Sequence, residues 1–162
     1  MPQNERRHER QDKLGLASFG FFILLVGVIW VITPDLFQKI IDFFKDFKLE
    51  EEIFPNVPFP APARPYRHLV VYTALARFCF VFGLFQIVIL VLRFFFRESL
   101  DKVAGAFSGV VFLLGVGFVS NLLAAGTIGW FGFFGWFIAF IGLSIVVRSL
   151  LVLLFEVALR KG

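Results

Sequence analysis

Four long apolar stretches alternate with polar segments along this chain. They cover residues 14–32, 69–96, 103–124 and 130–155. Each is close to or above the about 20 residues that an α-helix needs to cross about 30 Å of hydrocarbon. The pattern therefore predicts an all-α membrane protein whose four transmembrane helices form an antiparallel bundle, with the lipid bilayer as its main partner.

Composition supports this interpretation. The chain has 162 residues, of which 59% are hydrophobic and 25 are phenylalanine. A soluble domain of this size leaves too much surface in water to hide such a load, whereas lipid can cover it. The formal charge of +4 is not gathered into a basic run, so the sequence does not indicate a nucleic-acid partner.

Residues 1–13 form a charged tail before the first apolar stretch. Four basic residues in this tail resemble the start of a secretory signal: Arg6, Arg7, Arg10 and Lys13. The 19 apolar residues of Leu14–Ile32 exceed the about 7–15 of a cleavable signal, and no small-x-small site follows. We expect an uncleaved signal anchor.

The distribution of basic residues predicts the orientation. With the N-terminus inside, nine lysines and arginines lie in cytoplasmic segments and five on the opposite side. Because basic residues favour the cytoplasmic side, we expect a multi-pass protein of the cell membrane. Its N-terminal tail and its C-terminal tail, residues 156–162, are then both cytoplasmic.

Residues 33–52, between the first two spans, predict an amphipathic helix at the outer interface. Seven apolar residues between Leu36 and Phe47 fall on one arc of about 160°. Six acids against three lysines give this segment a net charge of −3, so attraction to anionic lipid is not its purpose. Three roles stay open: a shield over the span ends, a docking face for a partner, or a mobile lid.

Residues 53–68 are rich in proline. Five prolines fall within eleven residues, at positions 55, 58, 60, 62 and 65. Proline favours extended backbone and cannot donate a ladder hydrogen bond. We expect an extracytoplasmic strap without ladder hydrogen bonds that is either a semi-rigid connector or a recognition motif.

Small residues mark candidate packing faces, because helices in lipid associate by close approach at such residues. Gly105 and Gly109 form a GxxxG pair in the third span, and Gly135, Ala139 and Gly142 follow one another in the fourth. These residues predict that the third and fourth spans pack most tightly.

Four polar residues within the spans are candidate functional residues. Arg77 can extend toward the outer headgroups, whereas Arg148 leans deeper into the membrane and faces the bundle, a partner, an anionic headgroup or the interface. Gln86 lies at a similar depth to Arg148, which predicts a polar layer of the two with Ser108 or Ser144. Asn121 is expected to cap a helix end.

The sequence offers no recognisable catalytic set. No acid lies in the middle of a span, His8 and His68 lie outside the spans, and Cys79 is the sole cysteine. Proton or sodium coupling, a bound metal or cofactor, and nucleophilic catalysis are therefore not expected.

We expect a non-catalytic integral membrane subunit, which acts as scaffold, accessory or assembly component of a homo- or hetero-oligomer. The alternative is a small transporter or channel component that moves an anion or lipid-like solute past Arg77 and Arg148. A transporter requires a polar cavity around an arginine, whereas a scaffold requires dry helix contacts and an exposed docking face.

Overall fold

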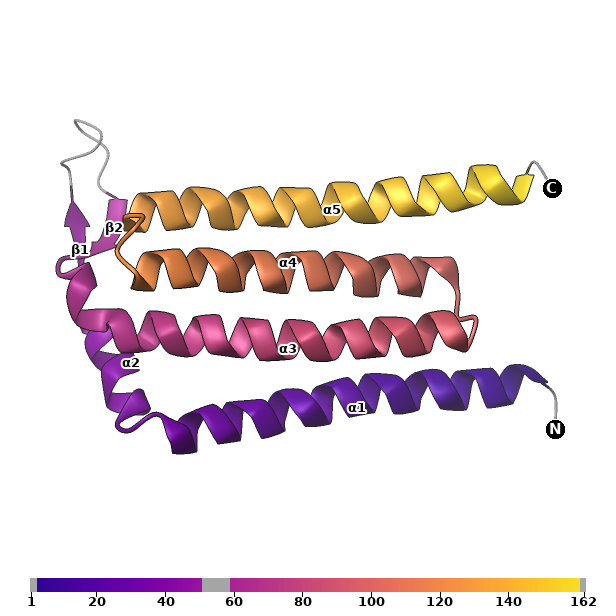
Figure 1. Ribbon diagram of the computed structural model, residues 1–162, viewed down its shortest axis with the longest axis horizontal. Helices are drawn as coiled ribbons and strands as arrows, with labels where there is room; N and C mark the ends of the chain where they lie inside the picture. Colours follow the sequence, from indigo (N-terminus) through magenta and orange to yellow (C-terminus); the bar gives the residue numbers. More distant parts are fainter. Residues whose placement is uncertain (1–2, 51–58, 161–162) are drawn as a thin grey trace.

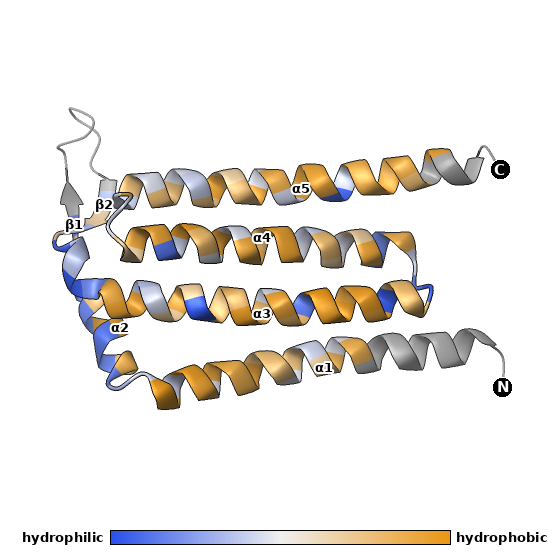
Figure 2. Cartoon of the chain, viewed as in Figure 1, coloured by the Kyte–Doolittle hydropathy of each residue, from blue (hydrophilic) through white to orange (hydrophobic). Residues whose placement is uncertain are grey.

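The computed structural model describes residues 3–50 and 59–160. The described elements are α1 (Gln3–Ile32), α2 (Leu36–Lys45), β1 (Phe47–Glu50), β2 (Phe59–Pro62), the 3-10 helix η1 (Pro65–His68), α3 (Leu69–Phe95), α4 (Leu100–Ala124) and α5 (Trp130–Arg160). Four of these helices, α1, α3, α4 and α5, are long and apolar enough to cross a membrane. Figure 2 shows apolar colour along all four of them. The predicted all-α fold of membrane type is confirmed at this level.

The four long helices lie side by side in a single layer (Figure 1). Their order in space is α1, α3, α4, α5, because α1 packs on α3, α3 on α4, and α4 on α5. Neighbours run antiparallel (Figure 1). The arrangement is an open row rather than a group of helices around a common core, which leaves α1 and α5 at opposite edges.

The open row sets how much of each helix is covered. In the most apolar 18-residue window of each span, 39% of the residues of α4 are buried, against none in α5. In water such exposure would be prohibitive, whereas lipid solvates apolar side chains as well as a protein interior does. The row therefore needs a bilayer on both of its broad faces.

Small residues line the contact between α3 and α4. A Cβ added at Gly83 would lie 2.8 Å from Cδ2 of Leu114, and one added at Gly117 would lie 3.1 Å from Cβ of Cys79. Ala76, Cys79 and Gly83 form a buried small-residue face of α3 at this contact. The α3–α4 pair, not the expected α4–α5 pair, is thus the most extensive contact of the chain.

The glycines predicted to pack the third span against the fourth do not lie at a close helix contact. A Cβ added at Gly105, Gly109, Gly135 or Gly142 would meet nothing within 4 Å. Ala139 is exposed on α5. Gly115 of α4, by contrast, leaves no room for a side chain on the side of α5. A Cβ there would overlap the ring of Phe140. The positions predicted to pack the third span on the fourth are therefore open within this chain.

A compact cap covers one end of the row (Figure 1). The amphipathic helix predicted over residues 33–52 is shorter, because α2 ends at Lys45 and the chain continues as strand β1. Strand β2, from the proline-rich segment, pairs antiparallel with β1, with Pro60 opposite Leu49. The strap predicted without ladder pairing is thus partly a strand, since proline is tolerated at the edge of a sheet. The remainder, residues 51–58, lies outside the described residues.

Aromatic side chains fasten the cap to the spans. Phe43 of α2 lies in a buried cluster with Tyr72 of α3 and Phe133 of α5. Trp130 meets Phe43 edge to face, with 5.8 Å between the ring centroids. Its indole N–H also donates a hydrogen bond of 3.3 Å to the carbonyl of Pro60. Cap and spans form one packed body at this end.

The outer helices extend past the predicted span limits. The predicted tail of residues 1–13 continues α1 back to Gln3, and the predicted tail of residues 156–162 continues α5 to Arg160. No proline interrupts either extension, and the residues of the first tail are largely good helix formers. Figure 1 shows both helices reaching beyond the α3–α4 turn, with the two chain ends at the same end of the row.

The packing predicts unequal effects of two glycine substitutions in α4. Gly115→Leu forces Phe140 to move and should lower the free energy of unfolding by about 1–3 kcal/mol. Gly109→Leu enters open space and should change it little. Thermal unfolding of the purified variants in one detergent measures both. Equal stability of the two variants would contradict the α4–α5 contact.

Candidate functional site

Two polar concavities lie at opposite ends of the row. The first, called the cap pocket, has a volume of about 450 Å³ and is lined by Lys39, Asp42, Asp46, Arg67, His68, Val70 and Val71. The second, called the hairpin groove, has a volume of about 380 Å³ and is lined by Gln86, Arg93, Asp101, Lys102, Gly105, Ala106, Gly109, Leu113 and Arg148. The hairpin groove lies beside the α3–α4 turn and contains two of the four predicted polar residues.

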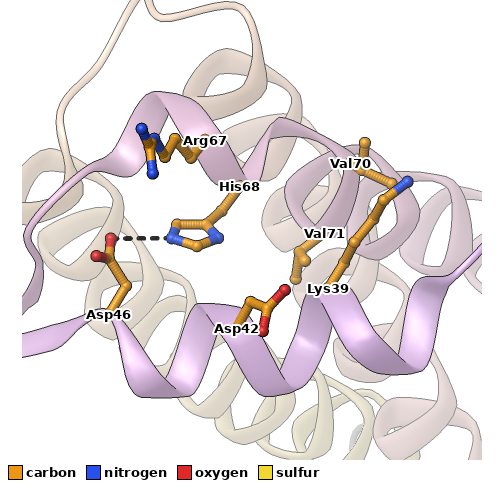
Figure 3. Close-up of a pocket in the computed structure, with 7 residues that line it drawn as sticks. All are labelled: Lys39, Asp42, Asp46, Arg67, His68, Val70 and Val71. Atoms are coloured by element: carbon orange, nitrogen blue, oxygen red, sulfur yellow. Dashed lines mark hydrogen bonds and ion pairs between the residues drawn. The ribbon is translucent and has the colours of Figure 1, made fainter.

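A carboxylate and an imidazole hold the cap pocket together (Figure 3). Asp46 follows the last residue of α2, and its Oδ2 lies 2.9 Å from Nε2 of His68. The same oxygen accepts a hydrogen bond of 2.8 Å from the backbone N–H of Arg64. The backbone carbonyl of Asp46 accepts another, of 2.9 Å, from the N–H of Ala63. Three interactions thus join the end of α2 to the segment that enters α3.

The position of Asp46 explains why it needs these partners. A carboxylate at the C-terminal end of a helix faces the negative end of the helix dipole. The hydrogen bond from His68 lowers the pKa of Asp46, and the backbone N–H of Arg64 lowers it further. His68 is only 7% exposed and lies 5.3 Å from the ring of Phe43. The pair therefore favours the ionised form of Asp46.

The chemistry of the cap pocket is limited by its lining. A carboxylate that orients an imidazole is two thirds of a hydrolytic triad, which also requires a hydroxyl or thiol nucleophile. The remaining lining residues are Lys39, Asp42, Arg67 and two valines. Over the described part of the chain, no group of three His, Cys, Asp or Glu residues is placed to hold a metal ion. The geometry is that of a clamp between α2 and α3.

Sequence reasoning missed this clamp. His68 was placed outside the spans without a role, and Asp46 was counted only as part of the charged face of a helix. The two residues are 22 positions apart, on either side of the proline-rich segment. The one local signal is an acid at the predicted end of a helix, where the dipole disfavours it.

The hairpin groove combines side chains from three helices. Arg148 of α5 donates a hydrogen bond of 2.9 Å from Nη2 to Oδ1 of Asp101 in α4. Arg93 of α3 lies 3.7 Å from the Glu98 carboxylate and donates a hydrogen bond of 3.4 Å to the carbonyl of Lys102. Ion pairs thus connect α3, the turn, α4 and α5 around one concavity.

Gln86 and Arg148 line the same groove, so the structure brings together the two residues of the predicted polar layer. The two serines do not join them. Ser108 donates its hydroxyl to the carbonyl of Gly105, and Ser144 donates to the carbonyl of Ile141, each within its own helix.

Arg77 and Asn121 are placed apart from both concavities. Arg77 is exposed on α3 and lines neither the cap pocket nor the hairpin groove. Asn121 is exposed near the end of α4. Its backbone carbonyl accepts a hydrogen bond of 2.9 Å from the N–H of Ala125, which is the ordinary last turn of a helix. Within the described residues, its side chain forms no cap.

Arg148 lies level with the α3–α4 turn, because its partner Asp101 is the second residue of α4. From there α5 continues for twelve residues to Arg160, which is about 18 Å of helix at about 1.5 Å per residue. Arg148 is thus paired at the level of the α3–α4 turn. The apolar residues of α5 that follow Arg148 extend beyond that turn.

Comparison with protein-family models, with curated proteins and with solved structures finds no match for this chain. Its function is therefore argued from its own geometry.

The clamp predicts a pH-dependent stability. Because the folded-state pKa of Asp46 is lowered, its stabilising contribution is complete above the unfolded pKa of about 3.9 and is lost as the pH falls through the folded value. Asp46→Asn should lower the melting temperature at pH 7, and the difference from the parent should shrink at acidic pH.

Asp42→Asn is the matched control, since Asp42 lies on the same helix and is hydrogen bonded to Gln38 instead. Melting curves of the three proteins are recorded in one detergent from about pH 3 to about pH 7, a range that covers carboxyl titration. They give the difference in melting temperature between each variant and the parent. A gap between Asp46→Asn and the parent that stays constant with pH would disprove the linkage.

Proposed function

We propose that this chain is a non-catalytic integral membrane subunit that assembles with a second copy of itself through α5. The observation that carries the proposal is the face of α5 that turns away from the row. Gly135, Ala139 and Gly142 are all exposed there, at spacings of four and three residues that keep them on one side of a helix.

The rotation of α5 supports this assignment. Its contacts with α4 are made by Phe140, against Gly115, and by Arg148, against Asp101. At about 100° per residue, the mean direction of these two contacts lies about 170° from that of the three small residues. The small face thus points directly out of the edge of the row, where a neighbouring helix can approach closely.

A second copy is the occupant that this face fits best. Helices in lipid associate where small residues allow their backbones to approach. Two such faces related by a two-fold axis present small residues to one another, which is the self-complementary arrangement of most homodimers. A different membrane protein on the same edge is the other outcome of the test.

The cap supports a structural role. On the lipid-facing side of α2, Phe37 and Phe44 are 56% and 67% exposed, whereas Leu36 and Phe43 pack inward. This division favours an interfacial helix that shields the span ends. The Asp46–His68 clamp opposes the mobile-lid alternative, because it fixes the end of α2 to the start of α3.

The arrangement favours a subunit over a transporter. The hairpin groove gives the transporter alternative its polar cavity around one arginine, Arg148. A transport path also requires that such a cavity continue across the membrane. The cap pocket and the hairpin groove lie at opposite ends and share no lining residue, and Arg77 lines neither of them. The pair of arginines in the alternative, Arg77 and Arg148, therefore does not frame one passage in the described structure.

The orientation that we propose places both termini in the cytoplasm of a cell-membrane protein, with the cap outside. In a Cys79→Ala background, Lys48→Cys in β1 and Ser99→Cys at the α3–α4 turn place single thiols at exposed positions at the two ends of the row. A membrane-impermeant maleimide added to intact cells should label Lys48→Cys alone. Labelling of Ser99→Cys in intact cells would reverse the orientation.

The α5 interface predicts that Gly142→Leu weakens self-association. We expect about a tenfold loss of dimer affinity, equivalent to about 1.4 kcal/mol. Gly27→Leu is the matched control, because Gly27 on α1 is equally open within one chain. Fluorescence energy transfer between labelled copies in liposomes, titrated over protein-to-lipid ratio, measures both. A monomeric parent, or equal loss in both variants, would refute the interface.

A further inference from the structure

The hairpin groove has the shape, charge and position of a phosphate site, and we propose that it binds the headgroup phosphate of an anionic phospholipid. Arg148 and Arg93 would contact the phosphate, and Gln86 the glycerol ester region deeper in the groove. This inference concerns one chain and does not depend on the proposed dimer.

Space for the headgroup comes from two glycines. A Cβ added at Gly105 or Gly109 would meet nothing within 4 Å, and both glycines line the groove. The resulting volume of about 380 Å³ is within the range of small-molecule sites. The GxxxG pair of α4 thus opens a concavity instead of closing a helix contact.

The charges around the groove favour an anion. Three cations line it, namely Arg93, Lys102 and Arg148, together with one carboxylate, Asp101. Glu98, a further carboxylate, is paired with Arg93 beside the groove. A phosphodiester oxygen is a suitable acceptor for the guanidinium groups of Arg93 and Arg148.

Unused hydrogen-bond donors point to the same ligand. Within the described residues, Nε of Arg93 and Oε2 of its ion-pair partner Glu98 are both buried and have no hydrogen-bond partner. Buried polar atoms are nearly always satisfied, so this donor requires an acceptor. The amide of Gln86 is partly buried in the groove and makes no hydrogen bond within the described structure. Phosphate and ester oxygens supply such acceptors.

The level of the groove explains why the anion should come from a lipid. The candidate span of α5 runs to Phe155, seven residues beyond Arg148, which is about 10 Å at about 1.5 Å per residue. A bilayer whose hydrocarbon covers the whole candidate span of α5 would also surround the charges of the groove. Placing charged side chains in hydrocarbon costs free energy. A headgroup that enters the groove removes this cost while its acyl chains stay in the lipid.

Part of the lining of the groove is apolar. Ala106 and Leu113 line it beside the charged residues. An apolar lining beside cations fits an amphiphile, whereas a free phosphate ion gains nothing from it. The shared chemistry is phosphate, and the experiment below separates the two sources.

The test measures lipid binding to the purified protein by native mass spectrometry. Phosphatidylglycerol and phosphatidylcholine are added separately, at equal concentrations, to the delipidated protein in detergent. We expect the parent to bind phosphatidylglycerol preferentially and Arg148→Gln to bind it about tenfold more weakly, because a charge-assisted contact is lost. Arg77→Gln is the matched control and should bind as the parent does.

Two further variants separate a direct contact from a structural effect. Asp101→Asn breaks the same ion pair as Arg148→Gln but raises the positive charge, so phosphatidylglycerol should bind at least as tightly as to the parent. Gly109→Leu fills the groove without changing any charge and should abolish the preference. If Arg148→Gln does not fold, these two variants decide the question.

Several results would overturn the proposal. Equal binding of the two lipids, equal effects of Arg148→Gln and Arg77→Gln, or weaker binding in Asp101→Asn would each show that the groove is not an anionic lipid site. Displacement of phosphatidylglycerol by millimolar inorganic phosphate at constant ionic strength would assign the groove to a free anion. Retention of the lipid under that competition supports the assignment.

Discussion

Close packing between α3 and α4 is the contact on which the rest of the structure depends. Gly83 and Gly117 allow the two backbones to approach, and the side chains of Leu114 and Cys79 fill the space that they leave. Every other span attaches to this pair: α1 to α3 and α5 to α4. Since apolar side chains gain little by leaving lipid for protein, nothing compels the outer helices to close around it. The result is a row.

A row of helices restricts where charge can be placed. The cap pocket and the hairpin groove, which contain charged side chains, lie at its two ends, where the cap and the α3–α4 turn bring several elements together. In each, a carboxylate pairs with a nitrogen group from another element: Asp46 with His68 at the cap, and Asp101 with Arg148 at the turn. Arg77 has no such partner in the described structure and lies on an exposed side of α3.

Local patterns predicted the spans well and the contacts between them poorly. The expected limits of 69–96 and 103–124 lie close to those of α3 and α4, because hydropathy is read along one segment at a time. A GxxxG pair shows that one face of a helix carries small residues, but not which helix packs against that face. Gly105 and Gly109 are predicted to lie at a helix contact and instead line a groove. Gln86 and Arg148, which their similar depth predicts to share a polar layer, line the same groove. The Asp46–His68 clamp depends on the fold of the proline-rich segment between them, which no local pattern encodes.

The two surfaces of α5 that carry the proposals do not compete. Phe140 and Arg148 face α4, and the groove lies on that side, whereas the small residues face the opposite way. A lipid in the groove would fill the space between α4 and α5 that Gly105 and Gly109 leave open. Among the other spans, α5 contacts only α4 extensively. A ligand that bridges α4 and α5 would therefore stiffen the contact that holds the small-residue face of α5 in position. Lipid binding and self-association are then expected to support each other, although they use different sides of one helix.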